Sequence, residues 1–87
     1  MEIEVLKEIE RWRILAEILL KEDKRVYIKD VHSNFYFADL LLVGENTLEI
    51  QCFGPENREG QKFVLYWANI VKFDEYKKEE ELGGGGR

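Results

Sequence analysis

The stretch WRILAEILLKEDKRVYIKD, residues 12–30, changes its hydrophobic period near Lys24. Before Lys24 the apolar residues recur every three or four positions, as they do on one face of a helix. After Lys24 they alternate with other residues, with Val26 and Ile28 as the apolar positions, as they do in a half-buried strand. This change predicts one N-terminal helix followed by β structure.

The helix is expected over residues 3–22. No glycine or proline interrupts this segment, and most of its residues are good helix formers. Its apolar stripe consists of Val5, Leu6, Ile9, Trp12, Leu15, Ala16, Ile18, Leu19 and Leu20. The stripe is wider than a two-stranded coiled-coil seam, so it needs a broad partner surface. Either it packs across one end of the β structure, or it mediates association between chains.

Five short strands are predicted downstream, separated by polar or glycine-containing turns. They are expected at about residues 25–29, 35–43, 47–53, 61–67 and 70–73. Apolar residues occupy both sides of the second strand, which indicates a strongly bent strand covered on both faces. The predicted fold is mostly β: an N-terminal helix followed by a five-stranded, strongly bent antiparallel barrel of the SH3-like type.

The strand alternation also predicts the core. We expect the helix stripe in part, together with Val26, Ile28, Leu40, Leu42, Leu48, Ile50, Leu65 and Ile70, to be buried. Cys52 follows the same alternation, so it is expected to act as a small buried hydrophobe.

The length of 87 residues permits one domain. We place it at residues 1–74 and expect residues 75–87, which are charged and then glycine-rich, to form a flexible tail.

The chain has 18 acidic and 13 basic residues and a net charge of −5. This charge argues against a protein that coats nucleic acid or an anionic membrane by electrostatic attraction. Glu is frequent in the chain, and Ser, Thr and Met are scarce, so its composition resembles that of hyperthermophile proteins.

The groups that catalysis requires are scarce, since His32, Ser33 and Thr47 are each the only residue of their type. A nucleophile with a positioned base is hard to assemble from this set, although Cys52 with His32 remains formally open. One His and one Cys cannot make a tetrahedral zinc site, and the glycines at 83–86 neither follow a strand nor open a helix. We therefore expect no enzyme activity, no catalytic residues, no metal and no cofactor.

The cysteine count and the hydropathy pattern indicate a cellular setting. A single cysteine cannot form an internal disulfide. No apolar run approaches the ~20 residues of a membrane span, and no signal peptide is recognisable. A cytoplasmic protein without a membrane partner is expected.

Three segments carry a family resemblance. Residues 38–43 (ADLLLV) are similar to a Gly-x-Leu-x-x-hydrophobic stretch, with Ala38 in the place of the glycine. Leu48-Glu49-Ile50 is similar to a hydrophobic-x-Leu motif, and Asn69-Ile70-Val71 is similar to an Asn-Ile-Val motif. In this order, after a helix, they resemble the Sm-like (LSm) family, in particular its small archaeal-type members. The resemblance covers residues 3–74.

The resemblance implies a site for single-stranded RNA. In the family, a loop Asp and Asn bind a uracil, and an Arg-Gly pair completes the pocket. Here Gly44 stands in the place of the Asp, Asn46 is the nearby amide, and Tyr66-Trp67 replace the Arg-Gly pair. The cationic clamp is therefore absent, although an aromatic ring can stack a base.

The candidate RNA-binding residues are Asn46, Tyr66 and Asn69. The alternative is that Trp67 belongs to the core and Tyr66 to an interface between chains. A local basic patch made from Arg11, Arg13, Lys24 and Arg25 also remains open.

The resemblance also implies rings in which the fourth strand of one subunit joins the fifth strand of the next. Residues 63–67 are apolar on both faces, and an unprotected strand edge of this kind normally ends up paired. The candidate interface residues are Val64, Tyr66, Val71 and Phe73.

The expected function is that of a homo-oligomeric assembly or scaffold module, which binds protein partners and lacks strong nucleic-acid affinity. One alternative is an Sm-like RNA-binding ring with a degenerate, weak site for single-stranded RNA. A second alternative is a stand-alone SH3-like barrel that binds proteins.

Overall fold

The structure is a computed structural model that describes the backbone of residues 2–77 and the side chains of residues 7–77. One α-helix is followed by five strands and two short 3-10 turns. Their bounds are α1 (Glu2–Lys21), β1 (Arg25–Asp30), β2 (Phe35–Val43), β3 (Thr47–Gly54), η1 (Glu56–Arg58), β4 (Lys62–Tyr66), η2 (Trp67–Asn69) and β5 (Ile70–Glu75). Within residues 2–77, no helix combines the length and the apolar character needed to cross a bilayer.

The predicted tail falls mainly outside the described residues, at positions 78–87. Its first part belongs to the fold. β5 extends to Glu75, and the backbone N–H of Tyr76 donates a hydrogen bond of 2.9 Å to the carbonyl oxygen of Arg25. The ordered domain therefore reaches beyond residue 74.

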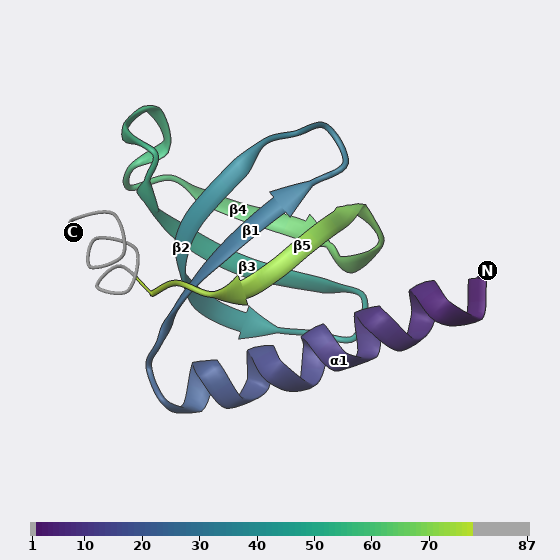
Figure 1. Ribbon diagram of the computed structural model, residues 1–87. Coiled ribbons are helices and arrows are strands. Elements are labelled where there is room, and N and C mark those ends of the chain that lie inside the picture. Colours follow the sequence, from purple (N-terminus) through teal and green to yellow (C-terminus); the bar gives the residue numbers. More distant parts are fainter. Residues whose placement is uncertain (1, 78–87) are drawn as a thin grey trace, which may run out of the picture.

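All five strands form one antiparallel sheet in the order β4-β3-β2-β1-β5 (Figure 1). Over the described part of the chain, β4 pairs only with β3 and β5 only with β1, so the sheet is not closed. Its two edges nevertheless approach one another, because the ring of Trp67, just after β4, lies 5.5 Å from the ring of Phe73 on β5. The sheet therefore curls around its core.

The helix packs against β2 and β5, along the lower side of the sheet in Figure 1. It ends where Asp23 adopts a left-handed conformation (φ 58°), which lets the N–H of Lys24 reach the carbonyl oxygen of Leu19.

Of the predicted apolar stripe of the helix, Ala16 and Leu19 are buried in the core. The predicted stripe is wider than the buried face, since its members Ile18 and Leu20 are exposed. The side chains of Val5 and Leu6 lie outside the described ones.

The core holds most of the predicted strand residues. Val26, Ile28, Leu40, Leu48, Ile50 and Ile70 are buried, and Leu65 packs partly buried against them. The prediction for Leu42 is wrong, because its side chain is 50% exposed. The cause is a break in the β2–β3 register between Leu40 and Leu42, which interrupts the alternation of β2 and turns Leu41 and Leu42 outward.

Candidate functional site

A hollow of about 620 Å³ lies where α1 meets the turn after β2 and the connection after β4. The helix contributes Glu10 and Arg13 to its wall, and the turn after β2 contributes Glu45 and Asn46. Tyr66 and Trp67 complete it from the end of β4. Segments far apart in the sequence are thus brought to one place.

Trp67 holds this arrangement together. Its backbone N–H donates to the carbonyl oxygen of Asn46 at 3.0 Å, and its Nε1–H donates to the carbonyl oxygen of Gly44 at 3.1 Å. Its ring is buried and packs edge-on against Phe73. Trp67 therefore joins the connection after β4 to the turn after β2. It is a core residue, as one of the interpretations of the sequence proposed, and its buried ring offers no surface on which a base could stack.

Gly44 occupies a position that leaves little room for a side chain. Its N–H donates to the carbonyl oxygen of Thr47 at 2.8 Å, and a Cβ added at Gly44 would lie 3.0 Å from that oxygen. An Asp at this position, where the resemblance puts one, would require the turn to shift. The turn is built without the carboxylate of the family pattern.

The three candidate RNA-binding residues are not all in the hollow. Asn46 and Tyr66 line it, and Tyr66 is 58% exposed. Asn69 is exposed but does not line the hollow, and its carbonyl oxygen accepts a hydrogen bond of 2.8 Å from the N–H of Val31. Two of the three residues therefore share one surface.

Arg13 was expected only as part of a possible basic patch, and it lines the hollow, whereas Arg11, Lys24 and Arg25 do not. Its Nη1 donates to the carbonyl oxygen of Glu45 at 3.5 Å. The signal in the sequence is its spacing, because Arg13 follows the stripe residue Ile9 by four positions and so lies on the same side of the helix. Glu10 and Glu45 also line the hollow, so its wall contains two acidic residues and one basic residue.

The open edges of the sheet carry most of the candidate interface residues. Val64 and Tyr66 project from β4 and are 61% and 58% exposed, and Val71 on β5 is 50% exposed. Phe73 differs, because its side chain is buried in the core of the same chain and only its backbone lies at the edge.

A polar network lies at the turn between β1 and β2. The buried carboxylate of Asp30 accepts hydrogen bonds from the N–H groups of His32 (2.9 Å) and Asn34 (3.0 Å), from the Asn34 amide (3.3 Å) and from the Tyr36 hydroxyl (2.9 Å). Arg58, from η1, donates to Asn34 Oδ1 at 3.0 Å and stacks over the Tyr36 ring at 4.9 Å. The network joins two loops distant in sequence.

These contacts shift the ionisation of the network. Burial alone would raise the pKa of Asp30, but the hydrogen bonds donated by Asn34, Tyr36 and His32 outweigh it and hold the pKa below its ordinary value. Burial, together with the hydrogen bond to the Asp30 carboxylate, raises the pKa of Tyr36. Asp30 is therefore an ionised, fully hydrogen-bonded anchor of the turn.

Cys52 is buried on β3, as the strand alternation predicts. Burial raises the pKa of its thiol. His32, by contrast, is exposed in the turn between β1 and β2. A protonated, enclosed thiol is a poor nucleophile, so the contacts around Cys52 favour its role as a core side chain.

Comparison of the chain with protein-family models finds no match, and comparison with curated proteins finds none either.

Proposed function

We propose that this chain is an assembly module whose copies join through the open edges of their sheets, with the curled sheet forming a strongly bent barrel of the Sm-like type. One observation carries the proposal: the two edge strands, β4 and β5, each present exposed apolar side chains beside unpaired backbone. Val64 and Tyr66 project from one edge and Val71 from the other. Such edges are normally covered by pairing.

The faces of the two strands support a particular register between copies. Phe63 on β4 and Phe73 on β5 both turn toward the core side of the sheet, because their ladder partners Ile50 and Ile28 are buried. If Phe63 of one copy is set opposite Phe73 of the next in an antiparallel ladder, Lys62 falls opposite Asp74. An opposite-charge pair at such a position contributes about 0.2–1 kcal/mol.

This interface joins two different edges, so it propagates from copy to copy and closes into a ring if the rotation permits. The role requires no catalysis. The lone, buried Cys52 fits a reducing compartment, and we include a cytoplasmic location in the proposal.

A charge exchange across the proposed ladder tests this function. Lys62→Asp and Asp74→Lys should each lower the mass measured by light scattering, because each places like charges opposite one another. The double variant should recover the wild-type mass. Lys21→Asp, the same charge change at the exposed end of α1, is the matched control and should leave the mass unchanged. Single variants with wild-type mass would contradict the register, and a monomeric wild type would contradict the function and favour a stand-alone barrel.

A second candidate function, weak binding of single-stranded RNA, is favoured by the hollow. Asn46 and Tyr66 share its wall with Arg13, which supplies a positive charge near the place where the Arg-Gly pair is missing. Glu10 and Glu45 oppose a phosphate there, so this candidate is the weaker one.

A further inference from the structure

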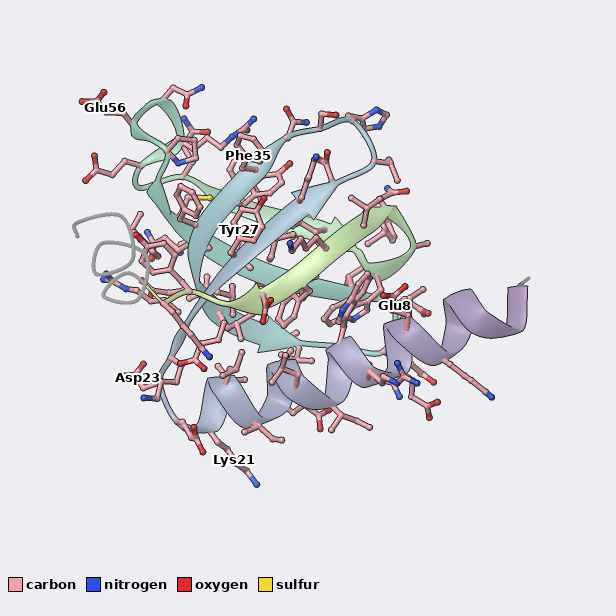
Figure 2. The ribbon with its side chains drawn as sticks, in the orientation of Figure 1. Glu8, Lys21, Asp23, Tyr27, Phe35 and Glu56 are labelled. Atoms are coloured by element: carbon pink, nitrogen blue, oxygen red, sulfur yellow. The ribbon has the colours of Figure 1, made fainter. Side chains whose placement is uncertain are left out.

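The outer face of the sheet carries five aromatic side chains in contact with one another, which we call the aromatic strip: Tyr27, Phe35, Phe37, Phe53 and Tyr76. Neighbouring ring centroids lie 5.2–6.3 Å apart. Figure 2 shows Tyr27 and Phe35 on the adjacent strands β1 and β2. The core lies on the other face of the sheet, so packing in the core does not account for these five aromatic side chains.

The strip leaves ring surface open to solvent. Phe35 is 45% exposed, and the other four rings are partly exposed. Phe37 sits against the backbone of β3, where a Cβ added at Gly54 would approach its Cδ2 to 3.1 Å. Arg25 stacks over the Phe53 ring at 4.2 Å and pairs with Asp39 at 3.1 Å. One end of the strip is thus covered by Arg25, whereas the Phe35 end is open.

Two lysines stand directly opposite one another at the open end. Lys29 is the ladder partner of Lys72 on β5 and of Phe35 on β2, so the three residues form one row across three strands. Like charges at opposed positions destabilise a sheet, and an anion placed between them relieves the repulsion. Within the described residues, neither lysine forms an ion pair. Asp74, opposite Tyr27, is the nearest carboxylate along the ladder and only partly offsets the two charges.

A second hollow, of about 380 Å³, lies beside this row. Its lining consists of the aromatic residues Tyr27, Phe37 and Tyr76, the basic residues Lys72 and Lys77, and the acidic residues Asp74 and Glu75. A planar group resting on these rings would have a lysine ammonium beside it. This is the arrangement that a nucleotide needs, with a surface for the base and a cation for the phosphate.

We propose that the aromatic strip binds single-stranded nucleic acid. Bases stack on Phe35 and on the rings of the second hollow, and backbone phosphates lie at Lys29 and Lys72. A carboxylate-rich peptide would satisfy the lysines but would leave the rings unused, so the combination favours the nucleic acid. Because the chain carries a net charge of −5 and Asp74 and Glu75 line the second hollow, the site is weak and sensitive to salt. It is separate from the hollow beside α1.

The test measures fluorescence anisotropy of a labelled oligo-deoxythymidine at several low salt concentrations. Phe35→Ala should weaken binding by about 5- to 150-fold, the loss of one stacked base, and Phe35→Trp should restore it. Lys29→Gln and Lys72→Gln should each reduce the slope of log affinity against log salt by about 0.7. Lys21→Gln removes the same charge from the end of α1 and should leave the slope unchanged.

Two comparison probes separate stacking from plain charge attraction: an abasic oligonucleotide of the same length and a polyglutamate peptide. Both should bind more weakly than the oligo-deoxythymidine. Equal binding of either probe would overturn the proposal, as would no binding at ~100 μM protein, a range that weak non-specific contacts still reach. Binding that is unchanged in Phe35→Ala but lost in Arg13→Gln would also overturn it, because the site would then be the hollow beside α1. Thermal melts monitored by circular dichroism check that each variant is folded.

Discussion

Asp30 is the residue on which the turn between β1 and β2 depends most. Its carboxylate accepts four hydrogen bonds in a buried position, including the one from the Tyr36 hydroxyl. Asp30→Asn replaces one acceptor oxygen by a donor and leaves buried donors unpaired. We expect a loss of about 1–3 kcal/mol in the free energy of unfolding at pH 7, measured by urea titration. Tyr36→Phe removes a single bond and should cost about 0.5–1.5 kcal/mol.

The ionisation of Asp30 also makes the free energy of unfolding depend on pH. The pKa of Asp30 in the folded chain lies below its ordinary value of 3.8, so its stabilising effect is complete above that value and is lost as the pH falls through the folded pKa. The difference in unfolding free energy between the wild type and Asp30→Asn should therefore shrink below about pH 4. A difference that stays constant down to pH 2 would contradict this assignment of the pKa.

Substitutions of Tyr66 and Arg13 test whether the hollow beside α1 binds RNA. A titration of labelled oligo-uridine should give weak binding, with oligo-adenosine as the comparison. Tyr66→Ala should weaken it by about 1–3 kcal/mol if the ring stacks a base. Arg13→Gln, which does not lie at a sheet edge, should weaken it too and leave the solution mass unchanged. Tight binding that neither change affects would place the RNA elsewhere.

At the scale of the element, β3 is the strand that the core depends on. Leu48 and Ile50 are fully buried in it. Truncating either to Ala should lower the free energy of unfolding by about 2–5 kcal/mol. Leu42→Ala is the matched control, since the register break in β2 leaves that side chain half exposed, and it should cost at most about 0.5 kcal/mol. If Leu42→Ala and Leu48→Ala lowered the free energy of unfolding equally, Leu42 would be a core residue, and the register break between Leu40 and Leu42 would be contradicted.

The edge strand β4 carries the next prediction. Val64 is exposed on it and points away from the core, so Val64→Lys should leave the fold intact. A lysine at a strand edge opposes pairing. We expect a lower mass by light scattering and an unchanged far-UV circular dichroism spectrum. A variant that unfolds would show that Val64 supports the single chain, and one that keeps the wild-type mass would remove β4 from the interface.

The elements could be predicted because the hydrophobic period changes sharply near Lys24 and the turns contain glycine, proline or polar residues. The outward turn of Leu42 could not, because three consecutive leucines fit either face and only the pairing with β3 fixes the break. The contacts of Arg13, which the sequence offered only as part of a possible basic patch, and of Arg58 could not be predicted for a related reason. Each acts across a long sequence separation, on Glu45 and Asn34, and such contacts exist only after the sheet has formed.

At the scale of the whole molecule, the helix and the curled sheet enclose one small core, while both sheet edges stay open over the described residues. A domain of this size buries a modest share of its surface and gains much from covering such edges. The two edges are also complementary in face and charge, with Lys62 on one and Asp74 on the other. These features together support assembly as the central property of the chain.

The most direct test is the mass of the wild-type chain in solution, measured by multi-angle light scattering from low to high micromolar concentration at physiological salt. The account predicts a fixed multiple of the single-chain mass that persists on dilution into the micromolar range. A single-chain mass at every concentration would contradict it.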